Sequence, residues 1–194
     1  RVNESLQSID RTRRRFDDAV FELGELEIEN TLTKQQVLEV IQRGELLGRL
    51  SKQVRKEAVG LGEDAGLVMI QIDSFESGVK RTLDLVLRDH LPIKRFRNIN
   101  KAVESISNLT YEELNKVEYL GSVLFMEPLD ETSVSKGYRV LGRLPGLPDN
   151  LHDLLIHKFK TLPNLLNAST DKLFEVDGIG RNRAQQLREY FDTL

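Results

Sequence analysis

The residues best suited to binding chemistry lie near the C-terminus, in the segment V-D-G-I-G-R-N-R-A at residues 176–184. Two glycines flanking an apolar residue predict a tight turn that places Ile179 in the core and starts a helix at its end. The first N–H groups of a helix have no partner inside it, and with the helix dipole they bind anions. Because Gly178 and Gly180 lack side chains, a phosphate could come close to this backbone.

Two arginines strengthen the prediction of a phosphate site. Arg181 and Arg183 fall in the first turn of the expected helix, where cations oppose the helix dipole, so helix stability alone does not explain them. As phosphate ligands they offer a planar fork of donors. The motif therefore predicts contact with the phosphate backbone of a nucleic acid, without a means of distinguishing bases. The alternative is a plain helix–helix turn with two solvated arginines.

A related turn occurs about 33 residues upstream, in L-P-G-L-P at residues 144–148. Pro148 takes the position of the second glycine and has no N–H to donate. We interpret this copy as mainly structural, although its charged neighbours could still contact DNA. The complete set of predicted DNA-binding residues is Arg143, Gly146, Lys158, Lys160, Gly178, Ile179, Gly180, Arg181, Asn182 and Arg183.

The elements around these turns are predicted to be helices throughout. Apolar residues make up 39% and charged residues 30% of the chain, a balance typical of helices with one wet face. Apolar side chains recur at helical spacing and no alternating strand pattern competes with them. We expect an all-α protein: an elongated helical bundle over residues 1–128, a polar connector at 129–136 and two helix-hairpin-helix motifs at 137–194.

Several helix boundaries are specified by short patterns. Thr33 with Gln36, and Thr110 with Glu113, form capping boxes. The first opens a helix with an apolar stripe that runs from Val37 through Ile41, Leu47, Leu50, Val54 and Ala58 to Leu61, and the second opens a helix containing Leu114 and Val117. A third long helix stops before Pro92. Gly44, Gly48 and Gly78 lie inside helical patterns, where close helix packing or a hinge would explain them.

Composition excludes several classes of protein. The chain has no cysteine, so disulfide scaffolds, thiolate metal sites and cysteine nucleophiles are excluded. No apolar run is longer than the four residues found at 67–70, which is too short to span a bilayer, and no secretory signal is visible. With a net charge of −3, contact with nucleic acid must be local. Since the first residue is Arg1 and not Met, we expect the chain to be part of a longer protein.

Other polar groups have simpler interpretations. His90, His152 and His157 lack the spacing of a metal site. The acidic cluster Glu22, Glu25, Glu27 and Glu29 is expected to be a solvated face. The basic clusters are Arg11, Arg13, Arg14 and Arg15, and Lys94, Arg95 and Arg97. The first cluster is expected to be solvated or to contact a further domain. Contact with DNA or a nucleotide remains the alternative for the first cluster, and contact with DNA for the second.

Together these segments resemble the bacterial DNA integrity scanning proteins, the DisA family. The resemblance rests on V-D-G-I-G-R-N-R-A, on G-Y-R-V-L-G-R-L-P-G-L-P at 137–148 and on F-K-T-L-P-N-L-L-N-A-S at 159–169. Upstream, F-E-L-G-E-L-E-I-E at 21–29 and V-I-Q-R-G-E-L-L-G-R at 40–49 are similar to the family's linker. The resemblance implies an elongated helical linker followed by a small tandem helix-hairpin-helix domain of the RuvA domain 2 type.

The family makes cyclic di-AMP from two ATP molecules, with Mg or Mn, in an N-terminal cyclase domain. Its Asp-Gly-Ala and Arg-His-Arg motifs do not occur in this sequence. The resemblance therefore implies a non-catalytic, cofactor-free part of a diadenylate cyclase. Its implied partners are DNA, branched or in recombination intermediates, and the cyclase domain. The implied location is the cytoplasm, associated with the nucleoid, with no membrane contact.

Two other functions compete with DNA sensing. A helix-hairpin-helix glycosylase places a catalytic Asp farther beyond its hairpin than the 14 residues that follow Gly180 here, and no nuclease carboxylate cluster is visible. The hairpins could instead dock another protein, which leaves a helical scaffold without direct DNA contact. Titration at several salt concentrations separates DNA binding from protein docking, because a protein that binds DNA phosphates loses affinity as salt rises.

Overall fold

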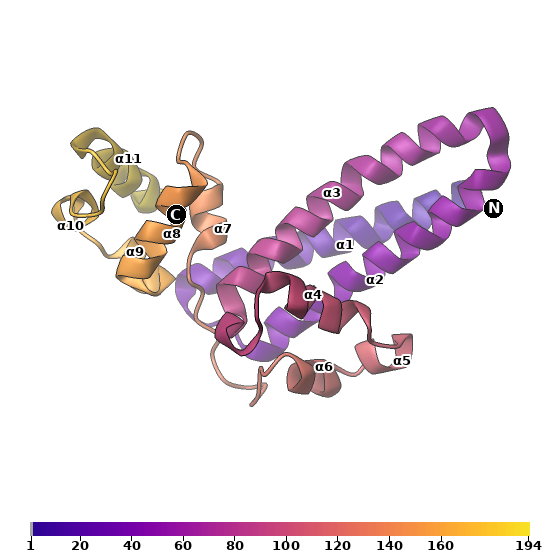
Figure 1. Cartoon of the computed structure of the whole chain (residues 1–194), viewed down its shortest axis with the longest axis horizontal. Helices are drawn as coiled ribbons and strands as arrows, with labels where there is room; N and C mark the ends of the chain where they lie inside the picture. Colours follow the sequence, from indigo (N-terminus) through magenta and orange to yellow (C-terminus); the bar gives the residue numbers. More distant parts are fainter. Residues whose placement is uncertain (1) are drawn as a thin grey trace.

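The computed structural model describes residues 2–194, and over this range it is helical, with one isolated β-bridge and no strand. Three long helices, α1 (Val2–Glu29), α2 (Lys34–Ala58) and α3 (Ala65–His90), lie side by side and give the molecule its length (Figure 1). None of the described helices is long and apolar enough to cross a membrane. The predicted all-α fold with an elongated bundle is confirmed.

The caps that start and stop these helices act through local hydrogen bonds. The Thr33 hydroxyl accepts from the Gln36 N–H at 3.3 Å, and the Gln36 side chain accepts from the Thr33 N–H at 2.9 Å, so the predicted capping box is confirmed. The predicted stripe holds from Val37 to Ala58 but is wrong at Leu61, which is 38% exposed. Leu61 lies in the 3₁₀ helix η1 (Val59–Asp64), where Gly62 at φ +62° breaks the helical path.

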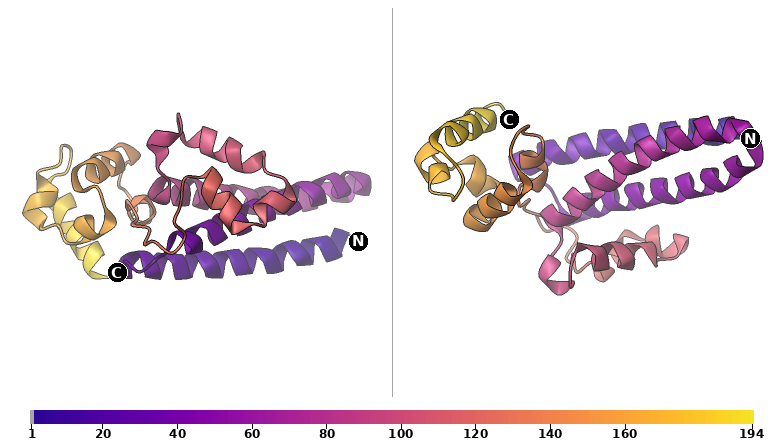
Figure 2. Two further views of the ribbon diagram at one scale, coloured as in Figure 1. Left: turned by 90° about the horizontal axis from the view of Figure 1, so that it is seen from below. Right: turned by 45° about the horizontal axis from the view of Figure 1, so that its top comes forward.

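Three short helices pack along one flank of the long ones: α4 (Ile99–Ser107), α5 (Tyr111–Leu114) and α6 (Val117–Val123) (Figure 2). They follow the 3₁₀ turn η2 (Ile93–Arg95). The predicted single helix holding both Leu114 and Val117 is wrong. The Asn115 side chain donates to the Tyr111 carbonyl at 2.8 Å and closes α5, so Val117 begins a new helix.

The remaining helices gather at one end of the molecule (Figures 1 and 2). They are α7 (Tyr138–Gly142), α8 (Asp149–Phe159), α9 (Leu162–Leu166), α10 (Thr170–Phe174) and α11 (Arg181–Asp192). Their apolar side chains form a core of their own, from Val140 to Phe191. The core of the long helices runs from Ile9 to Met126. The helices α1–α6, here called the helical linker, thus share one core, and the helices α7–α11, here called the hairpin unit, share another.

The segment between the two cores is fastened to both. The Ser133 N–H donates to the Leu32 carbonyl at 2.7 Å, beside an isolated bridge between Thr33 and Thr132. The Ser135 carbonyl accepts from the Leu162 N–H, also at 2.7 Å. A segment held at both ends by backbone hydrogen bonds fixes how the hairpin unit meets the long helices.

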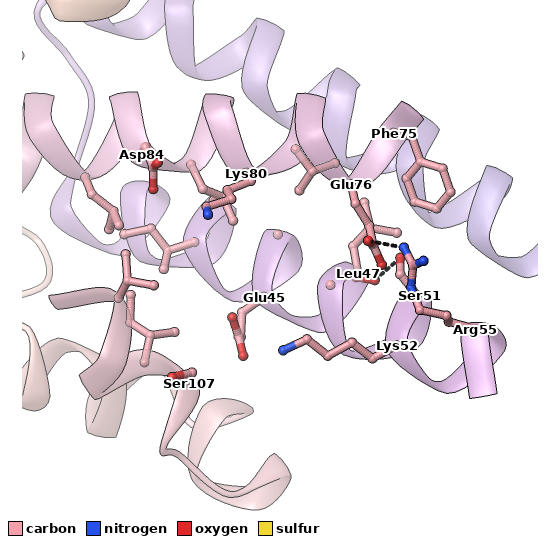
Figure 3. A pocket seen from close by; sticks show the side chains of 18 residues that line it. Glu45, Leu47, Ser51, Lys52, Arg55, Phe75, Glu76, Lys80, Asp84 and Ser107 are labelled. Atoms are coloured by element: carbon pink, nitrogen blue, oxygen red, sulfur yellow. Dashed lines mark hydrogen bonds and ion pairs between the residues drawn. The ribbon is translucent and has the colours of Figure 1, made fainter. Parts of the chain in front are cut away.

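The glycines inside the long helices have different surroundings. A Cβ added to Gly44 would lie 2.6 Å from the Leu83 methyl groups, so close packing explains this position. No atom lies within 4 Å of a Cβ added to Gly48 or Gly78, so packing does not explain these two. Gly44 and Gly48 line a groove of about 580 Å³ between α2 and α3, with charged side chains such as Lys52 around it (Figure 3).

This difference makes a matched pair of stability predictions. Gly48→Ala should raise the free energy of unfolding by about 1 kcal/mol, the propensity difference between alanine and glycine inside a helix. Gly44→Ala gains the same propensity but forces Leu83 to move, and overpacking costs about 1–3 kcal/mol. Denaturant unfolding of both variants should therefore give Gly44→Ala the lower stability. Equal stabilisation by the two changes would contradict the packing seen at Leu83.

Candidate nucleic-acid interface

The turn around Gly178-Ile179-Gly180, here called the second turn, has the geometry that its two glycines predicted; the turn around Gly146 is called the first turn. Gly178 adopts φ +81°, and a Cβ added there would lie 2.8 Å from a Leu151 methyl group of α8. Both the dihedral angle and the close approach favour glycine. Ile179 is 4% exposed and belongs to the core of the hairpin unit. Ile179 thus fixes the turn from inside, Gly178 leaves room for Leu151, and both glycines remain exposed.

The start of α11 presents donors that the protein does not use. Gly180 is the N-cap residue, with φ −79° and ψ 173°, and no side chain caps the helix. Among residues 2–194, no backbone acceptor pairs with the N–H groups of Gly180, Arg181 or Asn182. All three residues are exposed. Free N–H groups at a helix start form a site for an anion.

The two arginines beside this helix start keep their charge available. The Arg181 guanidinium lies 4.9 Å from the centre of the Phe174 ring, and Arg183 Nη1 donates to the Gly178 carbonyl at 3.2 Å. Neither forms an ion pair with a described residue. Both side chains are therefore held by neutral groups next to the free N–H groups, an arrangement that suits a phosphate.

The first turn repeats this backbone with different chemistry. Gly146, 32 residues before Gly178, has the same φ of +81°, and Pro148 at φ −61° and ψ 148° corresponds to Gly180. Proline removes one N–H, and Asp149 takes the position of Arg181. The two turns therefore share a shape, but the first offers fewer donors and a negative charge.

The other predicted DNA-binding residues lie away from the second turn or are already paired. Lys158 Nζ forms an ion pair with Glu175 at 2.7 Å, so its charge is neutralised. The Arg143 guanidinium lies against α1, 3.6 Å from where a Cβ of Gly24 would be. Lys160 is exposed at the end of α8, with φ +70°. DNA contact by these three residues stays a prediction.

The structure also contains a buried polar cluster that the sequence did not reveal, here called the joint: Glu27, Asp89, His90, Ser133 and Arg139. The prediction that Glu27 belongs to a solvated face is wrong, because it is 3% exposed. Glu27 Oε1 accepts from Arg139 Nη1 at 2.8 Å and lies 2.7 Å from His90 Nε2. His90 Nδ1 lies 2.8 Å from the Ser133 hydroxyl. The joint thus connects α1, α3, the connector and α7.

Asp89 completes the joint by capping α7. Its carboxylate accepts the N–H groups of Gly137, Tyr138 and Arg139 at 3.1, 2.6 and 3.2 Å. Burial, followed by the nearby charge of Glu27, raises the pKa of Asp89 from 3.8 to about 6. This carboxylate therefore ties the last turn of α3 to the first helix of the hairpin unit.

The predicted basic clusters of the linker have local contacts. Arg13 pairs with Asp17 at 3.6 Å, and Arg14 pairs with Asp10 at 2.9 Å, both one turn apart on α1 and exposed. The Arg95 guanidinium lies 5.0 Å from the centre of the Phe125 ring. Exposed ion pairs of this kind contribute little to stability. A role for these clusters in DNA binding stays a prediction.

Both parts of the chain match known protein families. Residues 1–130 match the family described as the DisA bacterial checkpoint controller linker region, and residues 149–194 match the helix-hairpin-helix motif. The all-α linker followed by a helix-hairpin-helix unit is thereby confirmed.

Relatives cover the whole chain. It is 36% identical to the DNA integrity scanning protein DisA of Kineococcus radiotolerans, 35% to that of Streptomyces avermitilis and 34% to that of Streptomyces coelicolor. Each comparison spans 100% of this chain but 54–55% of the relative. The chain thus spans about half the length of the curated relatives that it matches.

The joint predicts a non-additive pair of substitutions. Arg139→Met leaves the Glu27 carboxylate buried without its cation, and breaking a buried pair in this way costs about 3–5 kcal/mol. The double variant Glu27→Gln/Arg139→Met removes both charges and should be more stable than Arg139→Met alone. Denaturant unfolding of the parent, both single variants and the double variant measures this. A double variant as unstable as the sum of the singles would contradict the pairing.

The raised pKa of Asp89 makes the free energy of unfolding depend on pH. Because the folded protein holds this proton more tightly than the unfolded chain, the contribution of Asp89 is largest below pH 3.8 and is lost as pH rises through about 6. At about 1.36 kcal/mol per pKa unit, the loss is on the order of 3 kcal/mol.

The measurement is the stability difference between the parent and Asp89→Asn, which does not titrate. This difference should be larger at pH 5 than at pH 7. Comparing the two proteins removes the contributions of the other carboxylates. A constant difference, or one that grows toward pH 7, would contradict the raised pKa.

Proposed function

Because the chain belongs to the DisA family of DNA integrity scanning proteins, we propose that its hairpin unit binds the phosphate backbone of DNA without regard to base sequence. The observation that carries this proposal is the start of α11, where unpaired N–H groups lie beside the charges of Arg181 and Arg183. Gly178, Ile179, Gly180, Arg181, Asn182 and Arg183 form the main contact in this proposal. Contacts at Gly146, Arg143, Lys158 and Lys160 are secondary.

We also propose that the hairpin unit prefers branched or damaged DNA. Phosphate contacts carry no direct sequence information, so discrimination must come from the shape and deformability of the DNA. Because two turns of the same shape lie on one small core, they could contact two neighbouring stretches of DNA backbone. The long helices then act as a spacer and relay to a cyclase domain.

Catalysis and cofactors belong to other parts of the longer protein in this proposal. The residues from 2 to 194 supply the linker and the DNA sensor, and ATP with Mg or Mn serves the cyclase domain. The chain itself makes no cyclic di-AMP and works in the cytoplasm at the nucleoid. The alternative is a hairpin unit that docks another protein. Such a unit would lack the DNA affinity that falls as salt rises.

Replacing both arginines tests the phosphate contact. Arg181→Ala/Arg183→Ala should weaken binding to all duplex sequences alike and reduce the salt slope by about one to two phosphate contacts. Fluorescence titrations with duplex and branched DNA at several salt concentrations measure both quantities. Lys101→Ala/Lys116→Ala, which removes two exposed cations from the linker, is the matched control and should bind like the parent. An unchanged slope in the arginine variant would place the contact elsewhere.

The unequal turns make a sharper prediction. Gly180 at φ −79° lies in the range of proline, and Leu147-Pro148 already adopts this conformation in the first turn. Gly180→Pro should therefore keep the fold and remove one N–H, with a loss of about 1–3 kcal/mol of DNA affinity. Pro148→Gly should leave binding equal or slightly stronger.

Circular dichroism and thermal melting check that Gly180→Pro remains folded, and a titration at fixed salt gives the affinity. If the folded variant binds DNA as the parent does, the second turn is not the phosphate clamp. Protein docking then becomes the better explanation of the hairpin unit.

A further inference from the structure

A groove of about 610 Å³ separates α3 from the first turn of the hairpin unit. The α3 wall includes Arg81 and Arg88, and the opposite wall includes Tyr138 and the Leu144–Leu147 turn. The groove is a place where the linker and a helix-hairpin-helix turn face one another. It lies beside the first turn, where Pro148 has no N–H to donate, and not beside the start of α11.

Arg81 and Arg88 are free cations on this wall. Both are exposed, and within residues 2–194 neither side chain forms an ion pair or a hydrogen bond. The Arg88 guanidinium lies 6.0 Å from the centre of the Tyr138 ring. Neither arginine is therefore committed to holding the fold together by a polar contact.

Arginines elsewhere in the chain show what a structural role looks like. Arg55 bonds to Asp73 and Glu76, both at 2.6 Å. Arg188 donates to two carbonyls at 2.7 Å and to Asp192 at 2.9 Å. Compared with these, Arg81 and Arg88 have unused donors.

The acids of the hairpin wall do not pair with the two arginines. The Asp153 carboxylate accepts from the Tyr138 hydroxyl at 3.0 Å, and the exposed Asp149 lies 3.8 Å from His152 Nδ1. Asp84 lies on α3 between the two arginines and also lines the α2–α3 groove, where Figure 3 shows it beside Lys80. It forms no ion pair with a described residue. Arg81 and Arg88 are exposed whereas Asp84 is half-buried, so the positive charges of the α3 wall are more accessible than its negative charge.

We propose that α3 supplies the DNA phosphate contacts that the first turn lacks, through Arg81 and Arg88. The first turn keeps the shape of a phosphate-binding turn but has Pro148 and Asp149 where the second has Gly180 and Arg181. Cations from the neighbouring linker helix replace the missing ligands. The DNA surface therefore extends from the hairpin unit onto the linker. This inference rests on the proposed function and adds a second contact to it.

The spacing of the two arginines suits a DNA strand. Seven residues apart, they lie on one face of α3 and about 10 Å apart along it, at 1.5 Å per residue. Successive phosphates of one DNA strand lie closer together than this, so the two guanidinium groups can contact separate phosphates of the same strand. Guanidinium groups suit this role because each presents several donors to phosphate oxygens.

The test is DNA titration of the whole chain at several salt concentrations. Arg81→Ala/Arg88→Ala should bind duplex DNA several-fold more weakly, with a salt slope reduced by about two contacts, and Arg81→Ala alone should lose about one. Lys52→Ala/Lys56→Ala removes the same charge from exposed positions in the distal half of α2 and should bind like the parent (Figure 1). Circular dichroism verifies the fold, and Arg81→Ala avoids any effect on the contact between Arg88 and Tyr138.

The outcomes separate this surface from the α11 site. A parent that binds DNA, with an Arg81→Ala/Arg88→Ala variant of unchanged slope, overturns the linker contact and leaves the proposed function standing. An equal loss in Lys52→Ala/Lys56→Ala also overturns it, because bulk charge then explains the effect. A parent without salt-sensitive DNA affinity overturns the proposed function and this inference together.

Discussion

The buried ion pair between Glu27 and Arg139 is the contact on which the arrangement of the two parts depends. It joins the last turn of α1 to the first helix of the hairpin unit at 2.8 Å, with both side chains at most 5% exposed. A buried charge without a partner is costly, so neither residue can leave this position cheaply. His90 and Asp89 add α3 to the same cluster. The hairpin unit is thus held by polar contacts in a defined orientation, although it has a separate core.

These polar contacts couple the hairpin unit rigidly to the long helices. Asp89 accepts three N–H groups at the start of α7, and Lys136 Nζ donates to the carbonyls of Arg88 and Leu91 at the end of α3. In the proposed function, a displacement of the hairpin unit on DNA would therefore be carried into α3 and α1 and not absorbed by a loose connector. Directional hydrogen bonds suit this task better than an apolar contact, which tolerates sliding.

Local signals in the sequence were sufficient for much of the fold. The capping box at Thr33, the end of α3 before Pro92 and the turn at Gly178 depend on residues within a few positions of one another, so their patterns are visible in the chain. Leu61 was assigned wrongly because the α-helical period ends at Ala58, and the 3₁₀ segment that follows turns Leu61 away from the stripe. The joint could not be predicted, because its partners are 63 and 112 residues apart and Glu27 stands among exposed acids. A buried charge is indistinguishable from a solvated one until its partner is placed.

The two hairpin turns show why shape and chemistry have to be considered separately. Gly146 and Gly178 share one dihedral angle, and Leu147 and Ile179 fill equivalent places in one core, so folding constrains both turns alike. Folding does not constrain the outward residues, because Pro148 and Gly180 both fit the same extended N-cap conformation. Only the second turn combines free donors with cations. The inner residues of the two turns therefore reflect the shared fold, and only the outer residues can differ in what they bind; in our proposal, α3 supplies the cations that the first turn lacks.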